Sequence, residues 1–266
     1  MQIRVTFELL RPGQLLPFSY QYPLSSWIYR LIGRSNSAFS DFLHNEGYGE
    51  EGKRFKLFTF SRLKIQDFQK QGDRMKIFSP HISFVISFLA PQAAEEAIMG
   101  MFHQEEEKIG DQISQIQVRV KTVQMLREPE FSLGPITISA TSPIMVSRPD
   151  PGKDGKTGHK YLSPLDQDYE TYFFNNLLNK HQEAVAHNLA RPIEENPHLR
   201  FRLLSQSPRK NLIIIRANTP EQTKIVGYLF DFELEAPAEL VRVGLLAGFG
   251  GKNALGFGAG RVVNEK

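Results

Sequence analysis

Two kinds of hydrophobic spacing mark the first part of the chain. Hydrophobic and polar residues alternate from Met1 to Leu10, which predicts a half-buried strand. Between Pro23 and Gly33 the hydrophobic residues recur at helical spacing, which predicts a helix that begins at the proline and ends at the glycine. A short second helix is predicted from a Ser37 cap to Gly47.

Extended structure and one more helix complete the first half. Strands are predicted over residues 55–63, 76–79 and 81–89, with a polar turn at residues 69–73. A helix is predicted to begin at Pro91, and residues 112–126 return to strand alternation. The half is therefore predicted to run strand, helix, two strands, helix, strand.

The second half repeats this order of elements. Residues 127–135 contain prolines and a glycine without periodicity, which indicates a domain boundary. Beyond it the pattern predicts a strand broken at Pro143, a basic hairpin tip, two helices and four more strands. The broken strand covers residues 136–147, the hairpin tip 149–159, the helices 166–190 and 237–247, and the further strands 201–206, 212–217, 224–234 and 261–263.

Each half has the element order of a split βαβ unit, the supersecondary motif of ferredoxin-like folds. The sequence therefore predicts an α+β protein built from two tandem ferredoxin-like, RRM-like domains. The first domain is expected over residues 1–127 and the second over residues 135–266.

Composition narrows the class of protein without deciding its function. The 266 residues include no cysteine, which excludes disulfides and thiolate metal sites and is typical of cytoplasmic proteins. No hydrophobic run reaches the length of a membrane span, and the N-terminus lacks the features of a secretory signal. We therefore expect a cytoplasmic protein without membrane contact. A net charge of +3 slightly favours a polyanionic partner.

Glycine occupies six of the thirteen positions in GFGGKNALGFGAG, residues 248–260. The stretch does not fit the P-loop, because Gly251-Lys252 is followed by Asn253. It does not fit the dinucleotide fingerprint either, because it follows a predicted helix. Two interpretations remain. The bare main chain and Lys252 form a surface that meets an extended phosphate backbone, or the glycines form a tightly packed turn.

The stretch from Gly248 to Gly258 resembles the C-terminal glycine-rich motif of the CRISPR-associated endoribonucleases that cut precursor CRISPR RNA within its repeats. The resemblance extends to Ser142-Pro143-Ile144 and to the tract from Ser26 to Ser61, and it spans nearly the whole chain. It implies two tandem ferredoxin-like domains, in agreement with the element order. It also implies metal-independent cleavage of repeat RNA, with a 2′,3′-cyclic phosphate and a 5′-hydroxyl as the product ends.

A histidine near the end of the short predicted helix is a candidate for this chemistry. His44 precedes Gly47, where the helix dipole favours imidazolium, and imidazole exchanges protons near neutral pH. Helical geometry places Tyr29 and His44 away from the hydrophobic faces of their helices. Lys56 begins the next strand and can place positive charge against a phosphate. Taken alone, each residue is more commonly structural: a packing tyrosine, a helix cap and a surface lysine.

By the resemblance, Tyr29, His44 and Lys56 correspond to the catalytic tyrosine, histidine and lysine of the family. His44 is then the general acid or base, Tyr29 orients the 2′-hydroxyl or shares proton transfer, and Lys56 stabilises charge. The connection between His44 and Lys56 is longer than expected for the family, so Lys53 or Arg54 can supply the cation instead.

Cations beside the predicted strands and turns indicate a binding groove, and the candidate RNA contacts combine them with the glycine stretch. The candidates are Gly248, Gly250, Gly251, Lys252, Asn253, Gly256, Gly258, Arg209 and Lys210. Further cations expected near the groove are Arg62, Lys64, Arg200, Arg202, Arg216 and Arg242. Phe249 and Phe257 are predicted to anchor the stretch in the core.

The expected partner is CRISPR repeat RNA, with other effector subunits and a second copy of the chain as further candidates. No cofactor and no metal site is expected, because the histidines show no metal-ligand spacing. Two alternatives stay open: a subunit that binds repeat RNA without cutting it, and an α+β protein that binds a small anion or metabolite at the glycine stretch.

Overall fold

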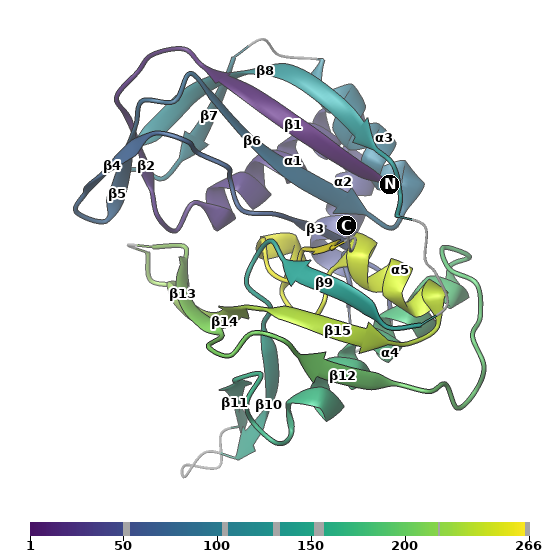
Figure 1. Ribbon diagram of the computed structural model, residues 1–266. Helices are drawn as coiled ribbons and strands as arrows, with labels where there is room; N and C mark the ends of the chain where they lie inside the picture. The colour runs from purple at the N-terminus through teal and green to yellow at the C-terminus, as the bar shows by residue number, and fades with distance from the viewer. Residues whose placement is uncertain (50–53, 103–105, 130–133, 152–156, 218, 264–266) are drawn as a thin grey trace.

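The computed structural model describes residues 1–49, 54–102, 106–129, 134–151, 157–217 and 219–263. Two antiparallel sheets dominate it, the N-terminal one at the top of Figure 1 and the C-terminal one below. Among the described residues, no helix is both long and apolar enough to cross a membrane.

The N-terminal sheet has the strand order β3-β6-β1-β8-β7. Without the edge strand β7, this is the order of a βαββαβ unit in which the third sheet strand lies between the first two, as a split βαβ motif requires. The strands are β1 (Gln2–Leu9), β3 (Phe58–Phe60), β6 (His81–Phe88), β7 (Glu107–Gly110) and β8 (Gln115–Leu126).

The C-terminal sheet has the same topology, with the strand order β12-β15-β9-β16. Its strands are β9 (Ile136–Ala140), β12 (Arg200–Leu203), β15 (Asp231–Glu235) and β16 (Gly260–Val262). The predicted α+β fold of two ferredoxin-like units is therefore confirmed by the strand order in both halves.

Each sheet is covered by a pair of helices (Figure 1), and each helix has a buried side. In the first half, α1 (Gln21–Ser35) and α3 (Pro91–Met101) pack together, and α1 buries Trp27 completely. In the second half, α4 (Tyr169–Ala186) packs against α5 (Ala238–Ala247). The predicted helices are all present.

The junction between the first two helices differs from its prediction. Gly33 does not end α1, which runs to Ser35, because Gly33 lies inside the helix against Ser40 of α2 (Ser37–Asp41). The cap is Asn36, whose side-chain oxygen accepts a hydrogen bond from the Phe39 amide at 3.0 Å. The last turn widens to a π-helix, η1 (Phe42–Glu46), which ends at Gly47 as predicted.

Each half also contains small hairpins outside its main sheet. The predicted turn at 69–73 is shorter, because β4 (Phe68–Gln71) pairs with β5 (Arg74–Ile77), which also pairs with β2 (Gln14–Pro17). In the second half β10 (Val146–Pro151) pairs with β11 (Thr157–Leu162), and the tip at 152–156 lies outside the described residues. Residues 224–234 form two strands, because β14 (Thr223–Leu229) pairs with β13 (Arg209–Ile215) and β15 joins the main sheet.

The two halves share one continuous hydrophobic core. At their junction the Thr59 hydroxyl donates a hydrogen bond to the Phe257 carbonyl at 2.8 Å, and the Arg62 amide donates to the Thr141 carbonyl at 3.0 Å. The 3-10 turn η2 (Asn253–Leu255) packs against β3 of the other half. The halves are therefore fixed to each other through buried contacts.

Candidate functional site

The fold brings Tyr29, His44 and Lys56 together on the helical side of the first half. The rings of Tyr29 and His44 meet edge to face, with centroids 5.4 Å apart. The Lys56 ammonium donates a hydrogen bond to the main-chain carbonyl of His44 at 2.8 Å. The three residues thus lie in one place: the Tyr29 and His44 side chains touch, and the Lys56 side chain contacts the His44 main chain.

Tyr29 is held rigidly between α1 and the sheet. Its ring packs edge to face on Phe58 of β3, with centroids 5.6 Å apart, and its carbonyl accepts a hydrogen bond from the Ser40 hydroxyl. Burial raises the pKa of Tyr29 well above its ordinary value. The phenol therefore keeps its proton near neutral pH and can donate a hydrogen bond, but it cannot act as a base there.

The π-turn places His44 at the surface. The imidazole is exposed, and its Nδ1 lies 3.1 Å from the side-chain oxygen of Asn45. With the proton on Nδ1 and the amide oxygen as acceptor, Nε2 is the atom that can exchange a proton with a substrate. A π-turn is common at functional sites because its extra residue redirects the side chains that follow.

Lys56 reaches His44 although the connection between them is long. A two-residue bridge between Tyr48 and Phe55, with both amide-to-carbonyl distances at 2.7 Å, closes the connection at its base. Gly47 makes the approach possible, because a Cβ atom there would lie 2.6 Å from the Phe55 carbonyl oxygen. The bridge therefore holds Lys56 in contact with the helix end although the connection is long.

A second cation lies beside Lys56. Arg54 donates to the carbonyl of Asn45 at 3.1 Å, so both cations face carbonyls at the helix C-terminus, where positive charge is favoured. Burial and then the charge of Arg54 lower the pKa of Lys56, while Glu46 opposes them. Lys53, the remaining candidate for the cation, lies outside the described residues.

The glycine stretch is mostly inside the protein, which corrects the expectation of an exposed main chain. Ten of its thirteen residues are buried, and among the candidate RNA contacts these include Gly248, Gly250, Asn253, Gly256 and Gly258. Lys252 is exposed at the tip and Gly251 beside it is half-buried. Among the candidate RNA contacts of the stretch, Lys252 and Gly251 are the ones accessible to an external ligand. Phe249 and Phe257 are fully buried, as the prediction of core anchors requires.

The atoms that lie against this backbone belong to the protein itself. A Cβ atom at Gly250 would overlap the Met145 carbonyl, one at Gly258 would overlap the Phe249 carbonyl, and one at Gly256 would lie 2.6 Å from the Phe60 ring. The backbone at these three glycines is also left-handed, a conformation that other residues rarely adopt. The tightly packed turn is therefore the correct interpretation of the two.

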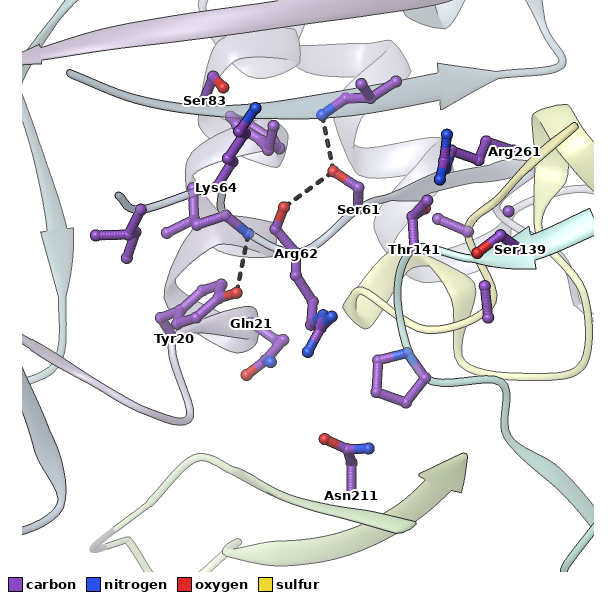
Figure 2. Close-up of a pocket in the computed structure, with 18 of the residues that line it drawn as sticks. Tyr20, Gln21, Ser61, Arg62, Lys64, Ser83, Ser139, Thr141, Asn211 and Arg261 are labelled. Carbon is purple, nitrogen blue, oxygen red and sulfur yellow. Dashed lines mark hydrogen bonds between the residues drawn. The ribbon is translucent and has the colours of Figure 1, made fainter. Parts of the chain in front are cut away.

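A basic cleft of about 830 Å³ separates the two sheets (Figure 2). Its cations come from both halves and are Arg4, Arg62, Lys64, Arg209 and Arg261. Figure 2 shows Arg62 directed toward the middle of the cleft and Arg261 beside Ser139 and Thr141. None of the described residues that line it is acidic. The cleft is thus suited to an extended polyanion.

Other predicted cations lie elsewhere. Lys210 follows Arg209 on β13, so its side chain points to the opposite side of the strand from the cleft-lining arginine. Three of the arginines are held in ion pairs with acidic residues: Arg200 with Glu235, Arg202 with Glu233, and Arg242 with Glu128 and Glu239. Fewer of the predicted cations therefore line the groove than the sequence suggested.

Comparison with known proteins assigns both halves to one family. Residues 15–123 match the family model described as "CRISPR-associated protein Cas6, N-terminal", and residues 126–262 match "CRISPR associated protein Cas6, C-terminal". The chain belongs to the Cas6 family. The resemblance inferred from the glycine motif is thereby confirmed, although the glycines themselves are internal.

Two relatives align with this Cas6 protein over nearly their full lengths. A "Putative CRISPR-associated endoribonuclease-like protein Cas6" of Pyrococcus furiosus is 26% identical, with 100% of both chains covered. A "CRISPR-associated endoribonuclease Cas6 1" of Methanocaldococcus jannaschii is also 26% identical, over 99% of this chain and 94% of the relative. A solved structure of a Cas6-related gene product of Pyrococcus furiosus has a TM-score of 0.83 at 24% identity, covering 100% of this chain and 99% of that one, which confirms the fold.

Lys180 is a buried residue of this Cas6 protein that the sequence analysis did not single out. It is 1% exposed, and its ammonium donates to the carbonyls of Gly248 and Gly250. The sequence does carry a signal, because Lys180 falls at helical spacing in line with Phe173, Leu177 and Ala184 on the buried face of α4. A lysine on such a face requires acceptors, and here the glycine stretch supplies them.

Lys180→Met should change how the stability of the protein depends on pH. Burial lowers the pKa of Lys180 from 10.5 to about 7, whereas the unfolded chain retains this proton up to the ordinary value. Between these two pH values the unfolded state binds more protons. The free energy of unfolding should therefore rise with pH, by up to about 1.4 kcal/mol per pH unit from this residue.

Urea unfolding at pH 7.5 and 9.5 measures the effect. The gain between the two pH values should be larger in the wild type than in Lys180→Met. The exposed Lys224→Met is the matched control and should keep the wild-type gain. Equal gains in the wild type and Lys180→Met would mean that Lys180 keeps an ordinary proton affinity in the folded protein.

Proposed function

We propose that this Cas6 protein is an endoribonuclease that cuts precursor CRISPR RNA within its repeats without a metal ion. The observation that carries the proposal is the joint cluster of Tyr29, His44 and Lys56. It is supported by the relatives named as CRISPR-associated endoribonucleases and by the basic cleft between the sheets.

The proposed reaction is attack of a 2′-hydroxyl on the adjacent phosphate. The 2′-oxygen bonds to phosphorus as the bond from phosphorus to the 5′-oxygen breaks, which leaves a 2′,3′-cyclic phosphate and a 5′-hydroxyl. One proton leaves the 2′-hydroxyl and one reaches the 5′-oxygen, and His44 transfers one of them through Nε2. Tyr29 donates a hydrogen bond that orients the reacting group, and the Lys56 ammonium stabilises the charge that develops on the phosphate.

Binding is assigned to the cleft and to the tip of the glycine stretch. The cations that line the cleft contact the RNA backbone, and Lys252 with Gly251 adds a contact outside it. Repeat RNA is the proposed partner. Association with other effector subunits, assembly into a homodimer and a cytoplasmic location stay predictions.

Incubation of the wild type with RNA from its own CRISPR array, in EDTA, tests the function. Specific cutting within the repeat, with a 2′,3′-cyclic phosphate on the upstream fragment, is the expected result. Tight binding without cutting would instead favour a repeat-binding subunit. Saturation by a mononucleotide with neither RNA binding nor cutting would favour the metabolite-binding alternative.

Replacing Arg62 and Arg261 by alanine should weaken the binding of repeat RNA and its dependence on salt. Each phosphate that is no longer neutralised by an arginine should lower the slope of log affinity against log salt by about 0.7 for a single strand, so the slope of the double variant should fall by about 1.4. Arg202→Ala is the matched control, because this exposed arginine is paired with Glu233 away from the cleft. Filter binding from low to moderate salt measures the slopes, and an unchanged slope would exclude the cleft as the binding site.

A further inference from the structure

Two exposed phenylalanines form a pair at the cleft. Phe18, which follows β2, is 38% exposed, and Phe68, which begins β4, is 42% exposed. Their rings meet edge to face, with centroids 6.4 Å apart and an angle of 74° between the planes. Elsewhere in the described part of the chain, Phe102 is the one other exposed phenylalanine.

The pair is held in place by main-chain hydrogen bonds. The Phe18 amide donates to the Asp73 carbonyl at 3.1 Å, and Phe68 lies opposite Ile77 in the ladder between β4 and β5. Both residues are thus attached to the same hairpin. Their rings form a fixed apolar platform at the protein surface, although exposing such rings to water is unfavourable without a ligand.

The surroundings of the pair are cationic on the side that faces the cleft. Both phenylalanines line the cleft between the sheets, together with the five arginines and lysines already described and without acidic neighbours among the described lining residues. Phe18 also lines an adjoining hollow of about 990 Å³, where the Arg216 guanidinium lies 5.6 Å from the centre of the Tyr22 ring. That hollow has acidic as well as basic lining residues, including Asp73 and Glu221, so the purely basic side of the pair is the one that faces the cleft. The pair therefore stands where two hollows meet, beside cations that can hold a phosphate backbone.

Charge and shape together select one kind of ligand. Exposed aromatic rings between cations are the arrangement that binds single-stranded nucleic acid, because bases stack on the rings while phosphates meet the cations. A base in a duplex is already stacked on both faces, so only an unpaired base can occupy the platform. An acidic protein surface would satisfy the cations but would leave the phenylalanines without a stacking partner.

We propose that Phe18 and Phe68 form a stacking platform for an unpaired base of the repeat RNA. The inference rests on the proposed function, since it assumes that this RNA occupies the cleft. It adds a binding role for two residues that lie outside the catalytic cluster, and it requires that the repeat segment in the cleft be single-stranded.

The test combines binding and crosslinking in the His44→Ala background, which prevents turnover. Phe18→Ala combined with Phe68→Ala should weaken repeat RNA binding about tenfold to a hundredfold. Phe102→Ala is the matched control, since this phenylalanine is 80% exposed at the end of α3, and it should bind as the parent does. Phe68→Trp should retain binding because it keeps an aromatic face. Each ring is partly buried, so the double variant should melt somewhat below the parent, and circular dichroism at the assay temperature verifies that it is folded.

Crosslinking identifies the stacked base. Repeat RNAs that carry 5-iodouridine at one position each should give, on irradiation, a crosslink to Phe18 or Phe68 at one or two neighbouring positions. Removing the base at such a position should weaken binding to the parent and leave binding to the double alanine variant unchanged. Annealing a complementary strand over it should abolish the crosslink.

The outcomes separate this inference from the proposed function. Wild-type cleavage together with unimpaired RNA binding by the double variant, and no crosslink to either residue, would overturn the platform alone. Crosslinking and weakened binding without any wild-type cleavage would support the platform and overturn the nuclease. If the double variant binds RNA normally but no longer binds a protein partner, the platform is a protein contact and the inference is wrong.

Discussion

His44→Ala should reduce cleavage of repeat RNA about 10²- to 10⁴-fold in single-turnover assays, because it removes the group that transfers a proton to or from the reacting oxygens. Repeat RNA binding should be nearly unchanged, since His44 does not line the basic cleft proposed to bind the RNA backbone. Gel-resolved cleavage in EDTA and filter binding on the same samples measure the two effects.

The matched control is His198→Ala. It removes an exposed histidine of the C-terminal half, which contacts Glu235 of the same half. It should cleave as the wild type does. Tyr29→Phe keeps the ring contacts with His44 and Phe58 but removes the hydroxyl, so it reports on the hydrogen bond alone. Undiminished cleavage by His44→Ala would mean that the observed cluster does not perform the reaction.

Gly258→Ala should destabilise the protein by about 3 kcal/mol or more, because two costs add. Alanine in the left-handed conformation costs about 1–2 kcal/mol, and its Cβ atom would overlap the Phe249 carbonyl, so the backbone must move. The Phe249 amide donates to the Gly258 carbonyl at 2.8 Å, which leaves little freedom for that movement. Urea or thermal unfolding measures the loss of stability.

Gly72→Ala provides the matched control for Gly258→Ala. Gly72 is also left-handed, but a Cβ atom there would meet nothing within 4 Å, so only the conformational cost of about 1–2 kcal/mol should appear. If Gly258→Ala were as stable as Gly72→Ala and instead failed to bind RNA, the glycine would contact the ligand and the internal packing described above would not explain it.

The sequence predicts the glycine stretch as a place of close approach but cannot say what approaches. A missing Cβ has the same signature whether the neighbour is a phosphate or the carbonyl of Met145, because the neighbour comes from a distant part of the chain. The core positions of Phe249 and Phe257 were predictable from their apolar chemistry. The acceptors of Lys180 were not, since they arise only when α4 packs beside the stretch.

The proposed catalytic cluster shows the same division. Hydrophobic periodicity placed Tyr29 and His44 on helices and away from their apolar faces. His44 is exposed as predicted, but the Tyr29 ring packs against the core on Phe58, where it also meets the His44 ring. Periodicity did not predict the π-turn, which depends on a hydrogen bond from the Gly47 amide to the Phe42 carbonyl rather than on residue type. The position of Lys56 depends on the bridge between Tyr48 and Phe55. Neither the length nor the composition of the connection predicts that these two residues pair.

The buried junction between the halves sets a condition on the ligand. Two hydrogen bonds join the halves beside the cleft, one from Thr59 to Phe257 and one from Arg62 to Thr141. The walls of the cleft therefore cannot swing apart as hinged domains do. A nucleic-acid strand that enters the cleft must therefore fit its fixed shape by bending its own sugar-phosphate chain. Pyrimidine-rich segments, whose bases stack weakly, should enter more easily than stiff purine runs.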